Sequence, residues 1–392
     1  MKKTTTARLG VAVLGLTLLA AACGSSKKAA PAATTAAPAG ATTAAPAAAG
    51  VKCSGIKFAF IGALSGDNGN LGKNMVNGAM IAINEFNKAN PGCQITLDQK
   101  DSQGDPKAAA PLGDAVAQDK SIVALIGPGF SGETKAVMPT IEAAGLAMIT
   151  PGATNAKLQT NGWKSFHRIL ANDDKQAPGV AKLIKSKGAK VIGVVDDQSE
   201  YGKGLADTVR KELGTVAVND SVAKGTDDYS ATVTKLKTAN VDYVFYGGYY
   251  ADAAKLVKQL RAAGSKAVFV SGDGSLDDGF VKGAGPDAEG ALLTATGAPS
   301  NVNAEFATKF KAAYGTDPAL YSPEAYDCAK VFLDAISAGK VTRADILAFT
   351  SAYDKAGVTK QIKFDATGEV AGDAVYAYEV KGGVISGLGL IK

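Results

Sequence analysis

The residues best suited to binding a small charged molecule follow short apolar segments of this chain. Ser131 stands in the glycine-rich stretch Gly127–Gly132, which comes directly after the apolar segment Ile122–Ile126. A serine hydroxyl and free backbone N–H groups at the start of a helix attract an anion. Asp273 lies between two glycines after another apolar segment and offers a carboxylate to a cation. Together these residues predict a site for a ligand that carries both charges.

Each of these two residues also has an ordinary structural interpretation. As an alternative, Ser131 would only cap the helix that it begins, and Asp273 would be a solvated turn aspartate. Tyr201 and Tyr249, near other predicted strand ends, favour a binding site instead. A tyrosine combines an apolar face with one polar group, which suits the wall of a small-molecule site.

The sequence gives less support to nucleotide or nucleic-acid binding. Gly127, Gly129 and Gly132 satisfy the G-x-G-x-x-G spacing. A dinucleotide site also needs an acidic residue about 20 positions further on, and that region reads Gly152–Thr154. The formal net charge is +5, with Lys and Arg spread among Asp and Glu. Nucleic-acid binding is therefore excluded, because it requires a basic patch or stripe.

A serine hydrolase is the rival from the enzyme classes. Ser131 would be its nucleophile and His167, the one histidine of the chain, its base. Ser131 lacks the G-x-S-x-G spacing of a nucleophile elbow, however. The cysteines Cys53, Cys93 and Cys328 form no C-x-x-C pair and no cluster with histidine. We therefore expect no metal site and no cofactor.

Apolar strand-like segments alternate with helical patterns through most of the chain. This rhythm predicts parallel sheets covered by helices on both faces. One series of strands ends near Ile149 and a second begins near Ala189, which predicts an α/β fold of two doubly wound parallel-sheet lobes. Strands are expected at 57–61, 95–99, 122–126, 147–149, 191–195, 243–246 and 268–271, and helices at 72–87, 106–118, 133–144, 175–186, 202–213, 230–238 and 251–263.

The last hundred residues depart from this rhythm. Helices expected at 303–314, 322–338 and 343–351 follow one another, and a hairpin of Val375–Val380 and Val384–Leu388 closes the chain. We expect the helices to pack on the first lobe and the hairpin to return to the second. The chain would then cross between the lobes several times and form a multi-strand hinge, near 169–172, 295–298 and 358–362.

The N-terminal residues predict export. A basic start, an apolar run at Leu9–Leu19 and small residues before Cys23 are the parts of a signal peptide, expected at 1–22. Cys23 stands where bacterial lipoproteins carry their lipid. The stretch 23–52, rich in Ala, Thr and Pro, is predicted to be a disordered tether. We expect an exported protein, lipid-anchored to the outer face of the cytoplasmic membrane.

Several stretches of the chain, in this order, resemble the leucine/isoleucine/valine-binding protein family, which has the type I periplasmic-binding fold. The resemblance implies a solute-binding protein of an ABC importer, with a membrane permease as partner. Its ligand would be a small amino acid, branched-chain amino acids first, bound reversibly and without catalysis. A sensing module for amides or small carboxylates is the alternative, and we expect a monomer. The stretches are Phe60–Gly66, Asp101, Asp105–Lys107, Ile126–Ser131, Ile149–Thr154, Gln198–Gly204, Asp242–Tyr249 and Ala325–Asp327.

The same resemblance implies roles for individual residues. The ligand's carboxylate would be held by Ser131 and the Thr154 region, and its ammonium by the Gly152 carbonyl, the Thr154 hydroxyl and Asp273. Tyr201 and Tyr249 would close the site from the second lobe. Two departures from the family concern the pocket: Leu71 replaces an aromatic residue, and Asp273 replaces a longer glutamate. We expect Leu71 and Phe130 in the pocket wall.

Cys53 and Cys93 are predicted to form a disulfide. Each lies just before a strand, and consecutive strands of such a fold are usually neighbours that start on the same edge. Export would permit the oxidation, and Cys328 should stay a buried thiol. The first lobe is expected to comprise 53–170 and 298–358, and the second 171–297 and 359–392.

Overall fold

The computed structural model describes residues 53–372 and 374–391. The predicted signal peptide (1–22), the predicted lipid-attachment residue Cys23 and the predicted tether (23–52) lie outside the described residues. Within the described ranges, no helix is both long enough and apolar enough to cross a membrane.

The first lobe is built on a five-stranded parallel sheet with the order β2-β1-β3-β4-β5. Its central strands are buried almost throughout, as expected for parallel strands covered by helices on both faces. The strands are β1 Lys57–Gly62, β2 Thr96–Asp101, β3 Ile122–Ile126, β4 Ala147–Thr150 and β5 Phe166–Arg168, and the helices that follow the first three are α1 Gly69–Ala89, α2 Pro106–Gln118 and α3 Ser131–Ala143.

The second lobe repeats this order as β7-β6-β8-β9-β10, and β13 and β14 extend it to a seven-stranded sheet. The two predicted doubly wound sheets are confirmed. The strands are β6 Ile192–Asp196, β7 Val218–Ser221, β8 Tyr243–Gly247, β9 Val268–Ser271, β10 Leu292–Ala295, β13 Tyr376–Lys381 and β14 Val384–Leu390, and the helices are α4 Asp173–Ser186, α5 Glu200–Leu213, α6 Ser230–Thr238, α7 Tyr250–Ala262 and α8 Asp278–Ala284.

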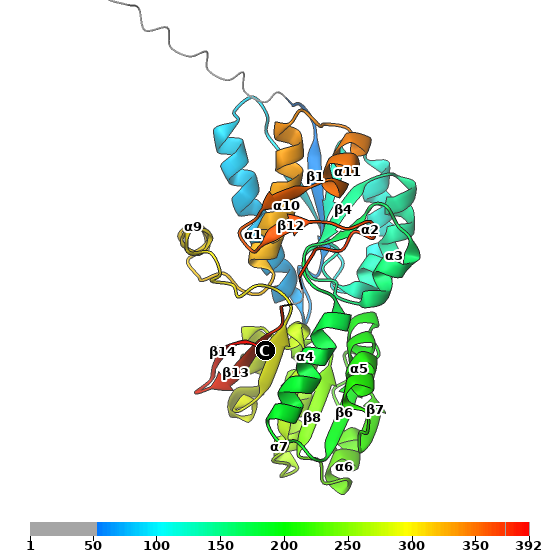
Figure 1. Ribbon diagram of the computed structural model, residues 1–392, viewed down its shortest axis with the longest axis vertical. Coiled ribbons are helices and arrows are strands. Elements are labelled where there is room, and N and C mark those ends of the chain that lie inside the picture. Colours follow the sequence, from blue (N-terminus) through cyan, green and yellow to red (C-terminus); the bar gives the residue numbers. More distant parts are fainter. Residues whose placement is uncertain (1–52, 373, 392) are drawn as a thin grey trace, which may run out of the picture. The chain divides into compact units, whose positions relative to one another are not determined.

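The late helices return to the first lobe, as predicted. Helices α9 (Ala304–Tyr314) and α10 (Ser322–Ser337) pack on α1, and α11 (Arg343–Ser351) lies against β3 and β4. Figure 1 shows α1, α10 and β1 side by side in one lobe and β6, β8 and α5 in the other. The predicted closing hairpin is also confirmed, since β13 pairs antiparallel with both β10 and β14.

The chain passes from the first lobe to the second for the last time after a small hairpin of β11 (Asp354–Ala356) and β12 (Gln361–Lys363). We predicted that crossing near 358–362. In the structure Glu369 still forms a parallel bridge with Arg168 of β5, which favours a crossing after Val370. The bounds of the lobes stay a prediction.

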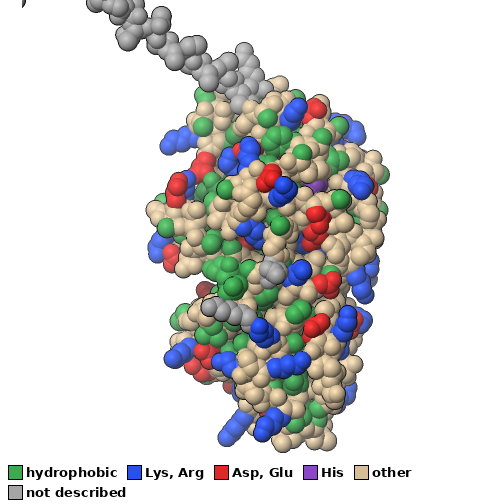
Figure 2. Space-filling view, in the orientation of Figure 1, with side chains coloured by type: hydrophobic (Ala, Val, Ile, Leu, Met, Phe, Trp, Pro, Cys, Tyr) green, Lys and Arg blue, Asp and Glu red, His purple; other side chains and the backbone are tan. Residues whose placement is uncertain are grey.

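The visible surface carries charges of both signs. Figure 2 shows Lys and Arg side chains interspersed with Asp and Glu side chains on the face in view. Elsewhere on the described surface, exposed ion pairs such as Lys203 with Asp207 and Lys311 with Asp317 also combine charges of both signs. Such pairs contribute little to stability, and this face carries no continuous basic stripe.

The predicted disulfide joins Cys53 and Cys93, whose Cα atoms are 4.6 Å apart and which are separated by 40 positions in the sequence. Cys328 is a buried thiol, also as predicted. The bond connects the segment before β1 to the segment before β2, at the edge of the sheet where both strands begin.

We predict that Cys53→Ser combined with Cys93→Ser lowers the free energy of unfolding by about 3–4 kcal/mol, because the open chain regains the entropy of a loop of this size. Urea denaturation of the oxidised protein and of the double variant measures the difference. Reductant should leave the double variant unchanged. A loss below about 1 kcal/mol would show that the unfolded chain is not constrained as this estimate assumes.

Candidate functional site

The predicted site residues lie at the carboxyl ends of strands from both sheets, where open α/β folds bind ligands. Ser131 follows β3 and Thr154 follows β4 in the first lobe, while Tyr201, Tyr249 and Asp273 follow β6, β8 and β9 in the second. None of these five residues is more than 4% exposed. The matching strand orders of the two sheets explain why loops so distant in sequence lie at corresponding edges.

Ser131 connects two loops of the first lobe. Its Oγ accepts a hydrogen bond of 3.1 Å from the backbone N–H of Asn155. The residue that caps α3 is Phe130, whose N–H donates to Glu133 Oε2 at 3.0 Å. The interpretation of Ser131 as a helix cap is therefore wrong, and its hydroxyl lies at the N-terminus of α3 beside the Thr154 loop.

The Thr154 loop is folded around another threonine. Thr150 Oγ1 donates to the carbonyl of Pro128 at 2.7 Å and accepts from the N–H of Ala153 at 2.9 Å. The Thr154 side chain is fully buried, and its hydroxyl has no hydrogen-bond partner among the residues that the structure describes. A buried hydroxyl without a partner is costly, so this group is available for a ligand.

Gly152 lies where any side chain would collide with its surroundings. A Cβ atom there would come within 2.6 Å of Met75 Cε and 2.8 Å of the Gly129 carbonyl oxygen, and it would also approach the Tyr321 ring. Glycine is therefore required for close packing at this loop, which leaves its backbone near the centre of the site.

Asp273 is fully buried and hydrogen-bonded to two tyrosines. Its Oδ1 accepts from Tyr201 at 2.7 Å and its Oδ2 from Tyr321 at 2.5 Å. Burial raises the pKa of Asp273 above its usual value, and the two tyrosine hydroxyls oppose that shift. The alternative of a solvated turn aspartate is therefore wrong.

Tyr321 is a residue of this site that the sequence did not reveal. It precedes α10, which packs on the first lobe, yet its hydroxyl reaches Asp273 of the second lobe. Its φ of +69° is in the left-handed region, a strained conformation for a bulky side chain. No turn motif around Tyr321 gave a signal for this conformation.

Asp173 is the other residue that we did not predict, because the stretch Asn172-Asp173-Asp174 reads as the polar start of a helix. It is 1% exposed, and neither of its carboxylate oxygens has a hydrogen-bond partner within the described ranges. Its backbone N–H donates to the carbonyl of Thr154 at 2.9 Å. Asp173 therefore lies beside the Thr154 loop with its side chain unsatisfied.

The surroundings of Asp173 disfavour its charge. Burial raises its pKa well above the usual 3.8 and the nearby charge of Asp273 raises it further, whereas the neighbouring Thr154 hydroxyl and the charge of Arg168 oppose the shift. Asp173 is the first residue of α4, where the positive end of the helix gives some compensation. Two buried carboxylates in Coulomb range of each other would be stabilised strongly by one cation between them.

Aromatic rings from three segments of the chain lie together beside the polar groups of the site. Phe130 and Tyr249 lie with ring centroids 4.4 Å apart, and Tyr201 and Tyr249 with centroids 5.2 Å apart. Lys224 Nζ lies 5.8 Å from the Phe130 centroid and 5.2 Å from that of Tyr249. Phe130 and Leu71, the predicted pocket-wall residues, are both buried. Rings from both lobes thus meet beside the polar groups.

Hydrogen bonds join the two lobes around these residues. Lys224 Nζ donates to the Gly104 carbonyl at 2.8 Å, and Asn70 Nδ2 donates to Asp277 Oδ1 at 3.0 Å. Asn155 Nδ2 donates to the Glu200 carbonyl at 2.5 Å. Since Asn155 also donates to Ser131, the loop that carries Thr154 is tied directly to the start of α5.

The proposed hydrolase pair is not brought together. His167 Nδ1 lies 3.3 Å from the Met148 carbonyl, and its Nε2 lies 3.1 Å from Ser351 Oγ. Burial lowers its pKa to about 4, so the imidazole is neutral and weakly basic at pH 7. His167 is a packed core residue, and Ser131 has Asn155 as its partner instead.

Other candidate sites are separate from this one. Among the described residues, no three His, Cys, Asp or Glu side chains are grouped so as to hold a metal ion. One surface hollow of the described structure is lined by Leu236 and Lys266 among others, and another by Cys53 and Val341. These hollows share no residue with the buried site.

Comparison with known proteins identifies the family. A family model described as periplasmic binding protein matches residues 55–384. The chain belongs to the periplasmic binding protein family. Its sequence is 35% identical over 246 residues to a Leu/Ile/Val-binding protein of Citrobacter freundii, covering 61% of this chain and 67% of that protein.

Further relatives extend over more of this periplasmic binding protein. It is 30% identical over 342 residues to the Leu/Ile/Val-binding protein BraC3 of Rhizobium johnstonii, covering 84% of this chain and 93% of that protein. It resembles the crystal structure of the branched-chain amino acid transporter substrate binding protein LivJ from Streptococcus pneumoniae in complex with isoleucine, with a TM-score of 0.78 and 26% identity, over 85% of this chain and 99% of that one.

We predict that Asp173→Asn makes the unliganded protein more stable than the wild type as the pH rises from about 4 to 7. A folded-state pKa above the unfolded value gives stability that is present at low pH and is lost as the pH rises toward the raised pKa. The difference should grow by up to about 1.4 kcal/mol per pH unit in this window. Urea denaturation at several pH values measures it.

The matched control is Asp174→Asn, which changes the next residue of the same helical turn, where the side chain is exposed. This variant should follow the wild-type pH dependence. A constant difference between wild type and Asp173→Asn across the whole pH range would contradict the electrostatic origin of the effect.

Proposed function

We propose that this periplasmic binding protein reversibly binds a small zwitterionic amino acid, with branched-chain amino acids as the first candidates. Relatives named for leucine, isoleucine and valine support this ligand class, as does the isoleucine complex of the LivJ structure. The residues that we propose as the binding site are Ser131, Gly152, Thr154, Asp173, Tyr201, Tyr249 and Asp273.

The observation that carries this proposal is the buried, unpartnered carboxylate of Asp173 near Asp273. Burying an anion that has no cationic partner costs several kcal/mol even after the protein has relaxed around it. A ligand ammonium between Asp173 and Asp273 would relieve this cost for both groups. The unpartnered hydroxyl of Thr154 would add a further hydrogen bond.

The ligand's carboxylate would lie at the first-lobe side of the site. The Ser131 hydroxyl is at the N-terminus of α3, where the helix dipole and free N–H groups favour an anion. The positive charge of the ligand would then face Asp173 and Asp273, and its side chain would face the rings of Phe130 and Tyr249.

The same charges argue against the alternative ligand classes. A carboxylate without an amine would bring a further negative charge next to Asp173 and Asp273, which like-charge repulsion disfavours. A neutral amide would leave both acids without a counter-charge. A ligand with a protonated amine is therefore favoured over either class.

We further propose that the protein is exported, anchored through a lipid on Cys23, and delivers its ligand as a monomer to the membrane permease of an ABC importer. The signal-like N-terminus supports the export and the anchor, and membership of a solute-binding family supports the partner. Metabolic labelling with a radioactive fatty acid, compared between wild type and Cys23→Ala, tests the anchor.

Thermal unfolding in the presence of single compounds tests the ligand class. The panel contains the common amino acids, their amides, and small carboxylates without an amine. We expect branched-chain amino acids to raise the melting temperature, since a ligand at 100 times its dissociation constant stabilises the native state by about 2.7 kcal/mol. Stabilisation only by amine-free carboxylates would contradict the proposal.

We predict that Asp273→Ala weakens binding of the amino acid found in this way by about 30-fold to several thousandfold. Truncating one member of a buried charge pair typically costs about 2–5 kcal/mol, at about 1.4 kcal/mol for each tenfold change in Kd. Isothermal titration calorimetry measures it. The control is Asp278→Ala, an acid of the same lobe whose side chain is 80% exposed.

The control variant should bind within about threefold of wild type, as surface substitutions rarely change free energies by more than about 0.5 kcal/mol. A change of this small size in Asp273→Ala, in a protein that still unfolds cooperatively, would remove Asp273 from the site and favour a ligand without an amine.

A further inference from the structure

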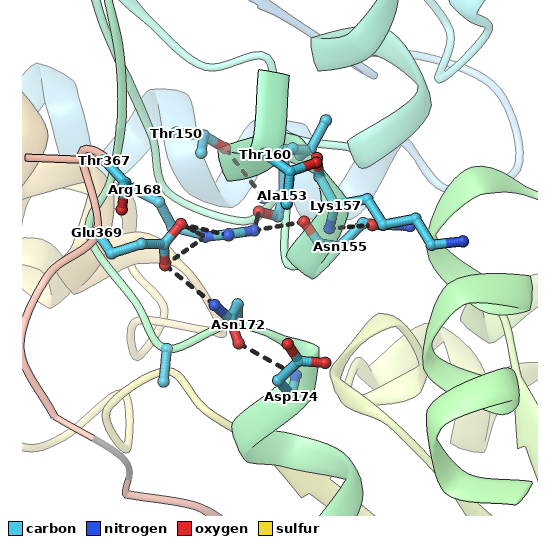
Figure 3. A network of polar contacts seen from close by, with 12 residues as sticks. Thr150, Ala153, Asn155, Lys157, Thr160, Arg168, Asn172, Asp174, Thr367 and Glu369 are labelled. Atoms are coloured by element: carbon cyan, nitrogen blue, oxygen red, sulfur yellow. Dashed lines mark hydrogen bonds and ion pairs between the residues drawn. The ribbon is translucent and has the colours of Figure 1, made fainter. Parts of the chain in front are cut away.

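A buried ion pair lies next to the proposed site without belonging to it. Arg168 is fully buried, and Glu369 is 9% exposed. Arg168 Nε donates to both carboxylate oxygens of Glu369 at 3.1 Å, and its Nη2 donates to Glu369 Oε1 as well. Figure 3 shows the guanidinium directed at the Glu369 carboxylate on one side and at the Thr154 loop on the other.

On the side of the loop, Arg168 holds the backbone around Thr154. Its Nη1 donates to the carbonyls of Ala153 at 2.8 Å and Asn155 at 2.9 Å. These carbonyls belong to the residues immediately before and after Thr154. Because a guanidinium is planar and rigid, bonds to both carbonyls fix the orientation of the peptide groups between them, and with it the direction of the Thr154 side chain.

On its other side, the pair is connected to Asp173. Glu369 Oε2 accepts from Asn172 Nδ2 at 3.3 Å, and Asn172 Oδ1 accepts from the N–H of Asp174 at 3.1 Å (Figure 3). Asn172 is thereby the cap of α4, and Asp173 is the first residue of that helix. The Glu369 carboxylate therefore bonds both Arg168 and Asn172, the residue that caps the helix on which Asp173 lies.

Glu369 is itself held firmly in this position. Arg168 N–H donates to the Gly368 carbonyl at 2.8 Å, and Val370 N–H donates to the Arg168 carbonyl at 3.2 Å. Gly368 has a φ of +80°, and a Cβ atom there would overlap the carbonyl oxygen of Phe166. The chain that carries Glu369 thus runs against β5 at a distance that only glycine permits.

Stability alone does not account for such a pair. Replacing a buried ion pair by well-packed apolar side chains is often neutral or stabilising, because the desolvation of both charges is avoided. Three segments that are distant in sequence, 153–155, 168–172 and 369, meet at these two side chains. The first contains Thr154, and the second leads directly into Asp173.

We propose that Arg168 and Glu369 are positioning residues for ligand binding: they hold the Thr154 loop and the start of α4 in the relative orientation that the ligand's ammonium requires. This proposal rests on the proposed function. It predicts that removing the pair weakens ligand binding more than it lowers the stability of the fold. Groups that orient the ligands of a metal typically change affinity by about 10- to 100-fold, and we expect a similar factor here.

The test compares wild type with Arg168→Met combined with Glu369→Met, a variant that removes both charges together. The readouts are the melting temperature, the Kd for L-leucine by calorimetry, and hydrogen exchange at the backbone amides of 152–155 and 172–174. We expect a melting temperature close to that of wild type, a Kd that is about 10- to 100-fold higher, and faster exchange in both segments.

The matched control is Arg343→Met. Arg343 donates to the backbone carbonyls of Ile122 and Ala117 at 2.9 Å and of Asp119 at 2.7 Å, away from Thr154 and Asp173. This variant should lose stability and keep the wild-type Kd. If the double Met variant folds and binds L-leucine as wild type does, the positioning role is refuted.

Glu369→Gln decides the matter if the double Met variant does not fold, because glutamine keeps the size of the side chain and removes its charge. A raised Kd relative to Arg343→Met supports the proposal, and an unchanged Kd overturns it. If wild type binds none of the amino acids, the proposed function has failed separately, and hydrogen exchange in the unliganded variants still tests the positioning: equal exchange at 152–155 and 172–174 overturns it.

Discussion

Two buried carboxylates that share one small region are the constraint on which the rest of this site depends. Asp173 and Asp273 are both essentially inaccessible to solvent, and each is disfavoured in its charged form by burial. Asp273 is supported by two tyrosine hydroxyls, while the side chain of Asp173 has no such support within the described ranges. The fold therefore keeps an electrostatic cost in the unliganded protein that a cationic group on the ligand would remove.

The contrast between Asp173 and Arg168 separates binding from positioning. Both are charged and buried, but Arg168 bonds a carboxylate and two backbone carbonyls. The two carboxylate oxygens of Asp173, by contrast, have no hydrogen-bond partner among the described residues. A buried charge whose hydrogen bonds are all made holds the surrounding backbone in place, whereas a buried charge without hydrogen bonds favours the binding of an oppositely charged group. The hydrogen-bonded charge of Arg168 at the end of β5 and the unpartnered carboxylate of Asp173 at the start of α4 therefore lie close together on one chain segment, 168–173.

The sequence predicted the sheets well where apolar strands are long, as in Ile122–Ile126, and where loops after them are rich in glycine. It did not reveal β5, because the stretch Phe166–Arg168 is too short and too polar to give a strand pattern. It also did not reveal β7, an edge strand with mostly polar residues. Asp173 reads locally as part of a helix start, and Tyr321 as an ordinary residue before a proline-containing helix. Both acquire their roles only through contacts with segments about 20 to 50 positions away, Thr154 for Asp173 and Asp273 for Tyr321, which local patterns do not encode.

The repeated strand order explains why such distant residues still converge. Each lobe places its first strand inside the sheet, with the second at the edge and the third on the other side, so the loops after the first and third strands diverge and leave room between them. Ser131 follows the third strand of one sheet and Tyr249 that of the other, since β3 and β8 occupy equivalent positions. Thr154 and Asp273 are related in the same way, because they follow β4 and β9, the fourth strands of the two sheets. Asp173 has no such counterpart, because it begins α4 directly after the residues 169–172 that follow β5. Its backbone N–H bonds the Thr154 carbonyl of the first lobe and its carboxylate lies in Coulomb range of Asp273 in the second, so its charge depends on contacts with both lobes.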